Sequence, residues 1–271
     1  MAAVHAWYFT DPASPGSWAI EPALRRLQVQ FGDGIDFTYV MGGMAREFSS
    51  PLEQVRAWLD AGDASGMPVD PRLWLDSPPK SSYPACLAVK AASEQGPEVV
   101  GVYLRRLREG FAYERRRLDT TDGLMSAARE VGALGFDRFQ VDLQSNAIAE
   151  LFGADLDRAA RVAEQHHGAG SGRVRMPAIE FRGDVGDVHG VYGVQPAEAY
   201  VAAATAAGAA ADDEAPGIED ALRRFGNMAT VEVAAACDLP GPRAAAELWR
   251  LAAEWRVRAE RRGSGELWSP T

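Results

Sequence analysis

Residues 3–20 read AVHAWYFTDPASPGSWAI, and the prediction of the fold starts from this short segment. Its apolar and aromatic start, residues 3–8, predicts a β-strand, and the proline- and glycine-containing run at residues 11–16 predicts a turn. A helix follows the turn, because apolar residues recur there at near-helical spacing: Trp18, Ile20, Leu24, Leu27 and Phe31. Residues 35–41 then alternate with period two, so the N-terminal segment predicts a right-handed strand-helix-strand unit.

The next part of the chain is predicted to be helical. Between residues 44 and 165, helical patterns are separated by Gly and Pro, and we expect helices at 51–59, 83–95, 97–109, 121–132, 137–151 and 155–166. A glycine-rich hinge at 168–172 then leads into a predicted strand at 175–181, a hairpin turn marked by Gly183 and Gly186, a strand at 188–191 and a helix that begins at Gln195. This order predicts one α/β sheet interrupted by a helical insertion.

A separate unit is predicted at residues 217–271, after an alanine-rich and acidic linker at 202–216. It has predicted helices at 218–225, 230–237 and 243–254, the second capped by Thr230, and a hairpin around Gly263-Ser264-Gly265. This pattern resembles a winged helix, but its eight arginines are matched by eight acidic residues, which does not suit a DNA-binding surface. We therefore divide the chain into residues 1–45, 46–168, 169–210 and 217–271.

The composition limits the kind of partner. The 271 residues carry a net charge of −10, which would repel nucleic acid over most of the surface. No apolar run is long enough to cross a membrane, and the N-terminus lacks the features of a signal peptide. Only Cys86 and Cys237 are present, which suits a reducing compartment and predicts two buried thiols. We expect a cytoplasmic protein that binds a small-molecule electrophile or a protein segment, and neither nucleic acid nor a membrane.

The candidate site is Ser14-Pro15-Gly16-Ser17, at the start of the first helix, opposite Pro177 before the third predicted strand. This arrangement resembles thioredoxin geometry, in which the same position carries Cys-x-x-Cys because a helix N-terminus stabilises a thiolate. A hydroxyl forms no disulfide and hardly ionises near neutral pH, so Ser14 and Ser17 exclude a redox dithiol here. Two interpretations stay open: the serines cap the helix, or Ser14 activates a thiol that a ligand supplies.

The chain resembles the DsbA-type thioredoxin family, especially its FrnE-like and YjbH-like branches. The segments that carry the resemblance are residues 8–12, 21–22, 38–44, 82–86 and 176–177, which read YFTDP, EP, TYVMGGM, SYPAC and MP. The resemblance implies a DsbA-like α/β thioredoxin fold, here with a helical insertion and a C-terminal winged-helix-like appendage. It also implies that Pro177 is a cis proline and that the backbone of Met176 lies beside the helix terminus to bind an extended substrate.

The four-residue motif is also similar to the Ser-Pro-x-Ser motif of kappa-class glutathione transferases and 2-hydroxychromene-2-carboxylate isomerases. That resemblance implies that Ser14 hydrogen-bonds the sulfur of a low-molecular-weight thiol, glutathione or mycothiol, while Ser17 assists. A hydrogen bond to a charged group contributes roughly 1.5 to 3 kcal/mol, enough to lower a thiol pKa by about 1 to 2 units. The leading interpretation is a thiol-dependent isomerase or transferase with Ser14 and Ser17 as catalytic residues.

Two other functions remain open. The same groove could hold a protein segment in a redox-inactive adaptor, or Cys86 could support residual thiol-disulfide oxidoreductase activity. Asp11 could favour the positive end of the helix or tune a thiol. Trp18 could fill the core or line the thiol site together with Met176 and Pro177.

Charged side chains outside the motif receive simpler interpretations. The arginines at 105, 106, 108 and 115–117 predict a solvated face, and the alternative is that they hold a carboxylate-bearing substrate. The neighbouring His166 and His167 would point in different directions on a helix, so we expect no metal site there.

Overall fold

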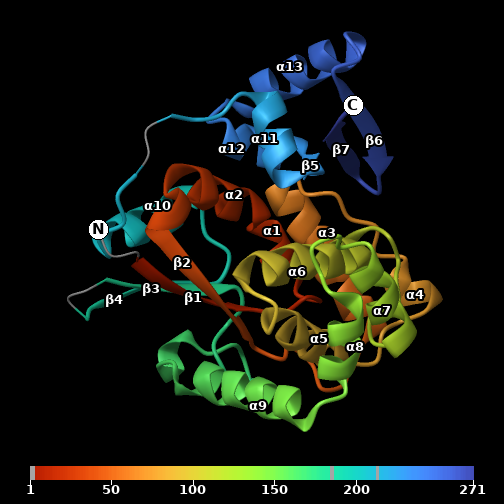
Figure 1. The fold of residues 1–271 in the computed structure, drawn as a ribbon, viewed down its shortest axis with the longest axis vertical. Coiled ribbons are helices and arrows are strands. Elements are labelled where there is room, and N and C mark those ends of the chain that lie inside the picture. The colour runs from red at the N-terminus through yellow and green to blue at the C-terminus, as the bar shows by residue number, and fades with distance from the viewer. Residues whose placement is uncertain (1–3, 184–185, 212–213) are drawn as a thin grey trace.

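The computed structural model describes residues 4–183, 186–211 and 214–271. Its main sheet has four strands, β1 (Val4–Thr10), β2 (Ile35–Met41), β3 (Ala178–Arg182) and β4 (Val188–Tyr192), in the order β2-β1-β3-β4 (Figure 1). β1 and β2 are parallel, whereas β3 is antiparallel to both of its neighbours. The predicted fold class, an α/β thioredoxin-like sheet with many added helices, is confirmed.

Helices cover both faces of this sheet. α2 (Glu21–Gln30) and α10 (Ala197–Ala206) pack on one face, in a core cluster that includes Tyr8 and Tyr200. α9 (Asn146–Arg161) packs on the other face, where Ala159 lies in a cluster with Phe9 and Val40. Alternate residues of β1 therefore enter two different cores, which explains why this strand is apolar on both sides.

The first predicted helix is in fact two helices. α1 (Pro15–Ala19) is followed by its C-cap residue Ile20, and α2 starts at Glu21. Pro22 has no backbone N–H to donate to the carbonyl of Trp18, so the helical hydrogen-bond ladder is interrupted there. A short 3-10 turn, η1 (Gly32–Gly34), then leads into β2.

The insertion between β2 and β3 contains α3 (Pro51–Ser65), α4 (Leu73–Asp76), α5 (Tyr83–Ser93), α6 (Pro97–Ala112), α7 (Thr121–Arg129), α8 (Phe136–Leu143), α9 and the 3-10 turn η2 (Glu164–His166). The predicted boundary between helices 137–151 and 155–166 is wrong. The break falls at Ser145, whose hydroxyl accepts the N–H of Ala147 and caps α9, while Gly153 lies inside α9. Within the described ranges, no helix is both long and apolar enough to cross a membrane.

Residues 175–177 precede β3 and are not part of it, although the sequence predicted a strand from residue 175. Parts of the predicted first strand, hairpin turn and linker fall on residues 1–3, 184–185 and 212–213, which lie outside the described residues.

The C-terminal unit has three helices and a small sheet. Its elements are α11 (Ile218–Phe225), β5 (Met228–Ala229), α12 (Thr230–Ala236), α13 (Gly241–Ala253), β6 (Val257–Arg262) and β7 (Gly265–Pro270), with strand order β5-β7-β6. The hairpin and all three helices were predicted, and β5 was not. Thr230 is not the cap of α12 as predicted, because its hydroxyl accepts the indole N–H of Trp268 at 2.9 Å and Ala229 is the N-cap residue.

The tip of the β6–β7 hairpin is bound to the helical insertion. Ser264 exchanges two hydrogen bonds with the backbone of Val69: its N–H donates to the carbonyl at 3.0 Å, and its hydroxyl accepts the N–H at 3.1 Å. Gly263 has a φ of +53°, and a β-carbon there would lie 2.2 Å from the Val69 carbonyl oxygen. The tip is therefore held against the helical insertion by hydrogen bonds, although Gly263 and Ser264 remain exposed.

Candidate functional site

Ser14 caps α1. Its backbone is extended, with φ −82° and ψ 114°, and its hydroxyl accepts the N–H of Ser17 at 3.1 Å. Only 3% of Ser14 is exposed. Ser14 therefore makes the contact of a helix cap, which is one of its two interpretations. A ligand could contact its hydroxyl only through the small part of the residue that is exposed.

Ser17 is fully buried and points away from solvent. Its hydroxyl accepts a hydrogen bond from Thr10 at 2.9 Å, and Thr10 in turn accepts one from Arg108. Arg108 is itself only 2% exposed. The chain of contacts from Arg108 through Thr10 to Ser17 is thus internal, and it leaves Ser17 unable to reach a substrate.

The motif and the proline loop are in contact. The Met176–Pro177 peptide bond is cis, as the resemblance implies. A β-carbon placed on Gly16 would lie 2.9 Å from Pro177 Cδ and 3.5 Å from the Met176 carbonyl oxygen. The structure therefore brings Ser14, Gly16, Met176 and Pro177 to one place, and the close approach leaves little room for a larger side chain at position 16.

Asp11 contacts a thiol, as one of the two interpretations from the sequence allowed, and that thiol is the side chain of Cys86. Asp11 is fully buried and accepts four hydrogen bonds, from Ala13 N–H, Met44 N–H, the Ser82 hydroxyl and the Cys86 thiol. Burial raises the pKa of Asp11, although these hydrogen bonds act in the opposite direction. Asp11 thus ties the turn before α1 to the loop after β2 and to α5.

The two thiols are poorly placed for chemistry. Cys86 is fully buried, and its sulfur lies 3.2 Å from Asp11 Oδ2. Burial, and after it the charge of Asp11, raises the pKa of Cys86 well above its usual value, so little of it is thiolate near neutral pH. Cys237 is buried in the C-terminal unit, as predicted.

Trp18 belongs to the core. It is fully buried, and its indole N–H donates to the carbonyl of Pro68 at 2.9 Å. The guanidinium carbon of Arg105 lies 4.5 Å from the ring centroid. Of the two interpretations of Trp18, the structure supports the core residue and not the wall of a thiol site.

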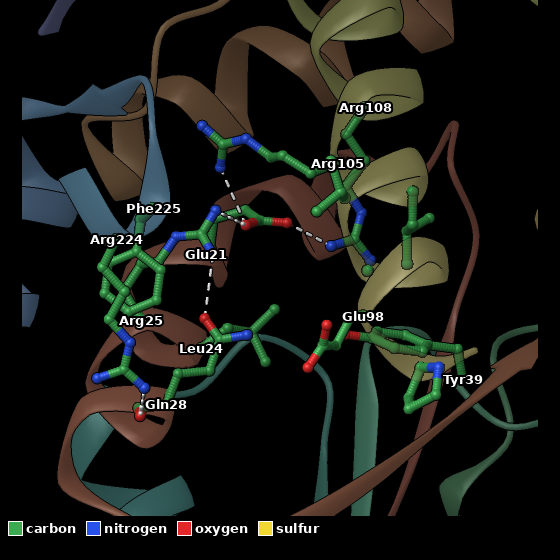
Figure 2. A pocket seen from close by; sticks show the side chains of 14 residues that line it. Glu21, Leu24, Arg25, Gln28, Tyr39, Glu98, Arg105, Arg108, Arg224 and Phe225 are labelled. Atoms are coloured by element: carbon green, nitrogen blue, oxygen red, sulfur yellow. Dashed lines mark hydrogen bonds and ion pairs between the residues drawn. The ribbon is translucent and has the colours of Figure 1, made fainter. Parts of the chain in front are cut away.

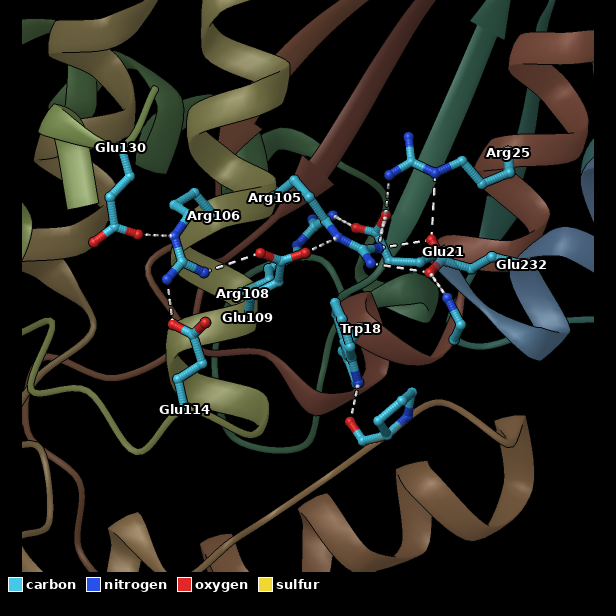
Figure 3. A network of polar contacts seen from close by, with 12 residues as sticks. Trp18, Glu21, Arg25, Arg105, Arg106, Arg108, Glu109, Glu114, Glu130 and Glu232 are labelled. Carbon is cyan, nitrogen blue, oxygen red and sulfur yellow. Dashed lines mark hydrogen bonds and ion pairs between the residues drawn. The ribbon is translucent and has the colours of Figure 1, made fainter. Parts of the chain in front are cut away.

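The prediction of a solvated arginine face on α6 is wrong for Arg105 and Arg108. Figure 3 shows them in a buried network, in which Arg105 and Arg108 both donate to Glu21, and Arg105 also donates to Glu232. Glu21 and Glu232 are far from α6 in sequence, so the pattern of α6 alone could not reveal them. Arg106 is partly exposed and forms ion pairs with Glu109, Glu114 and Glu130.

The side chains of His166 and His167 make different contacts, in keeping with the expectation that they point in different directions. The His166 ring stacks on Tyr192 with centroids 3.7 Å apart, while His167 Nε2 lies 2.8 Å from the carbonyl of Val162. Each ring is thus occupied by a local contact.

Comparisons with known proteins fit this geometry. A family model described as thioredoxin matches residues 7–166. The chain is 28% identical to the ClpXP adapter protein SpxH of Halalkalibacterium halodurans, over 96% of this chain and 86% of that protein. It is 27% identical, with the same coverage, to the protein of that name from Shouchella clausii.

A solved structure described as a putative protein disulfide isomerase from Nitrosomonas europaea superposes with a TM-score of 0.63, at 18% identity, over 76% of this chain and 97% of that one. At this identity the match shows the fold alone.

Proposed function

The chain belongs to the thioredoxin family. We propose that it is a redox-inactive adaptor of the DsbA type that binds an extended segment of another protein beside Pro177. The relatives that match almost its whole length are named as ClpXP adapters, which supports an adaptor role and suggests delivery of a client protein to a protease. Assignment to the FrnE-like or YjbH-like branch and a cytoplasmic location are part of the same proposal.

The main support for the proposal is that the backbone N–H and carbonyl of Met176 are free to bind a partner. Among the described residues, neither the N–H nor the carbonyl of Met176 takes part in a hydrogen bond, although its neighbours Arg175 and Pro177 both do. Met176 is half-buried beside Gly16, and β3 begins only at Ala178. A free N–H and a free carbonyl next to the end of a sheet are the groups that an extended peptide would use.

The environment of Ser14 and Ser17 favours a protein that binds a partner segment and catalyses no reaction on it. Both hydroxyls are covered and are already used inside the protein, Ser14 by the N–H of Ser17 and Ser17 by Thr10. Neither position supplies a sulfur for a mixed disulfide. A partner segment would therefore be held by main-chain contacts and released unchanged.

The experiment uses Val194, which is 49% exposed and lies beside Gly16. A photo-crosslinking residue at position 194 should capture a client protein that also accumulates when the gene for this chain is deleted. Val194→Asp should reproduce the accumulation, because a charge beside Gly16 would oppose binding of the partner segment. The matched control is Val141→Asp on α8, also exposed, which should leave client levels normal. Accumulation that Val194→Asp does not reproduce would overturn the proposal.

A second candidate is the thiol-dependent isomerase or transferase. It is favoured by one observation: the Ser14 hydroxyl accepts a hydrogen bond but donates none to any described residue, so its proton is available to a thiolate. Calorimetric titration with glutathione and with mycothiol tests this candidate. Binding that Ser14→Ala weakens by about tenfold to a hundredfold would support it, since a charged hydrogen bond contributes roughly 1.5 to 3 kcal/mol. Residual oxidoreductase activity through Cys86 is the least supported, because that thiol is buried and its pKa is raised.

A further inference from the structure

The main sheet has an open edge at β4. This strand comes last in the order β2-β1-β3-β4, and in Figure 1 it lies at the margin of the sheet. A hollow of about 670 Å³ runs along it, lined by His166 on one face of the sheet and by Ala199 and Ala203 on the other. Because residues from both faces line the same hollow, solvent reaches the edge of β4 itself.

Three residues of β4 direct their backbone N–H and carbonyl groups away from β3. The Gly193 N–H donates to the Pro177 carbonyl at 2.8 Å, which continues the β3–β4 register one residue beyond β4. Hydrogen-bonded and non-hydrogen-bonded pairs alternate along an antiparallel ladder, so Val188, Gly190 and Tyr192 form the non-hydrogen-bonded pairs with β3. Their N–H and carbonyl groups therefore face the open edge, where another extended strand could bond to them.

The sequence of β4 lacks the features that keep edge strands apart. Edge strands commonly carry charged residues, proline or a bulge, which oppose pairing with another chain. Residues 188–192 read VHGVY, without Lys, Arg, Asp, Glu or Pro, and their pairing with β3 is continuous. Val188 is 42% exposed. This edge is therefore suited to pairing with a further strand.

One charged side chain of each sign flanks β4. Asp187 directly precedes the strand. At the other end, Arg175 Cδ lies 3.4 Å from a β-carbon placed on Gly193. Both Asp187 and Arg175 are exposed, and neither side chain forms an ion pair or a hydrogen bond with any described residue. The negative end and the positive end of β4 are thus both available to another molecule.

Arginines elsewhere beside the sheet are already paired. Figure 2 shows Arg105 and Arg108 beside Glu21, to which both donate. Arg182, at the end of β3, lies 3.3 Å from a carboxylate oxygen of Glu180. Arg175 differs from these arginines, because its carboxylate partner would have to come from another molecule.

We propose that two copies of the chain pair through β4 in an antiparallel dimer with twofold symmetry. With Gly190 on the twofold axis, Val188 of each copy lies opposite Tyr192 of the other, and no other register pairs all three outward-facing residues. This register also puts Asp187 of each copy opposite the position after Tyr192 of the other, beside Arg175. Opposite charges at the two ends of one strand complement each other when two copies run antiparallel, so they favour a second copy over an unrelated acidic or basic segment.

Sedimentation equilibrium of the full chain tests the dimer. Pairing of one short strand buries less area than a standard interface, so the protein concentration should span about 1 to 500 µM. The average mass should rise from 29.2 kDa toward twice that value as the concentration increases. A mass that stays at 29.2 kDa throughout would overturn the proposal.

Charge reversal identifies the surface. Asp187→Arg and Arg175→Asp should each weaken dimerisation at least about tenfold, because each creates two like-charge contacts in the dimer. An equimolar mixture of the two variants should dimerise again, since each supplies the charge that the other lacks. The matched control is Asp63→Arg, an exposed carboxylate on α3, which should leave dimerisation unchanged. A dimer that persists in both single variants, or a mixture that stays monomeric, contradicts the assigned surface.

Val188→Pro tests the backbone contacts. It removes an N–H that faces the open edge, and proline is tolerated as the first residue of a strand. Dimerisation should weaken at least about tenfold, because each copy loses a hydrogen bond, while urea unfolding should show that the fold is retained. Dimerisation of native strength in this variant rules out pairing through β4. None of these measurements depends on the adaptor function, because Met176 and Val194 are left unchanged.

Discussion

The guanidinium of Arg105 on α6 donates two hydrogen bonds, of 2.7 and 2.9 Å, to the carboxylate of Glu232 on α12 (Figure 3). Glu232 is fully buried and also accepts from Arg25 and from the N–H of Ala229. One carboxylate thus joins the insertion, α2 and the C-terminal unit. Together with the bond between Ser264 and Val69, this contact fixes the C-terminal unit against the rest of the chain.

Glu232→Gln should lower the free energy of unfolding by about 3 to 5 kcal/mol, because it leaves the charges of Arg105 and Arg25 buried with less compensation. The matched control is Glu247→Gln, which removes an exposed ion pair with Arg250 and should cost less than about 1 kcal/mol. Urea unfolding of both variants measures the difference. If both variants lose a similar, small amount of free energy of unfolding, the buried contact of Glu232 contributes little to stability.

Glu21 should make stability depend on pH in the acid range. Burial by itself would raise its pKa, but Arg105, Arg108 and Arg25 outweigh burial and lower the pKa from 4.5 to about 2. Because the folded-state pKa lies below the unfolded one, the stabilisation is complete above about pH 4.5 and is lost as the pH falls toward 2.

The measurement is urea unfolding of the native protein and of Glu21→Gln across that range. The difference in free energy of unfolding between the two should shrink as the pH falls, which separates Glu21 from the other carboxylates. A difference that stays constant with pH would contradict the assigned charge of Glu21.

The sheet could be predicted from the sequence because its strands are marked locally, by alternation in residues 35–41 and by the turn at residues 11–16. The break between α8 and α9 could not be predicted, because Ser145 and Gly153 are both residues at which a helix can break. The sequence does not show that Ser145 caps α9 and that Gly153 lies inside it. The position of Pro177 opposite the motif was predicted through a family resemblance, and the covered state of the two hydroxyls was not.

The arginine network shows the same limit. The sequence predicts Arg105 and Arg108 to be surface residues because other charged residues surround them along α6. Their acidic partners, Glu21 and Glu232, lie far from α6 in sequence. Tertiary ion pairs of this kind depend on which elements pack together, and that information is not local.

Both cysteines should react slowly in the native protein. Burial raises the pKa of Cys237 to about 11, and burial and the charge of Asp11 raise the pKa of Cys86 well above its usual value. Ellman's reagent at about pH 8 should therefore find little reactive thiol before unfolding and both thiols afterwards. Cys86→Ser and Cys237→Ser assign any residual reaction, and we expect it from Cys237, which is 7% exposed against 0% for Cys86. Rapid native reaction at Cys86 would reopen the oxidoreductase candidate.

Gly16 and Gly153 should respond in opposite directions to the same substitution. Both lie in helices, where Ala normally stabilises by about 0.5 to 1 kcal/mol relative to Gly. At Gly153 a β-carbon meets nothing within 4 Å, so Gly153→Ala should show that gain. At Gly16 the β-carbon would lie 2.9 Å from Pro177 Cδ, part of a rigid ring, so Gly16→Ala should instead cost about 1 to 3 kcal/mol.

Thermal or urea unfolding of the two single variants measures this contrast without any knowledge of the partner. A loss at position 16 with a gain at position 153 means that the motif and the cis-proline loop are in contact in solution. If Gly16→Ala also stabilises the protein, the loop stands away from α1, and the groove proposed for a partner segment loses its geometric basis.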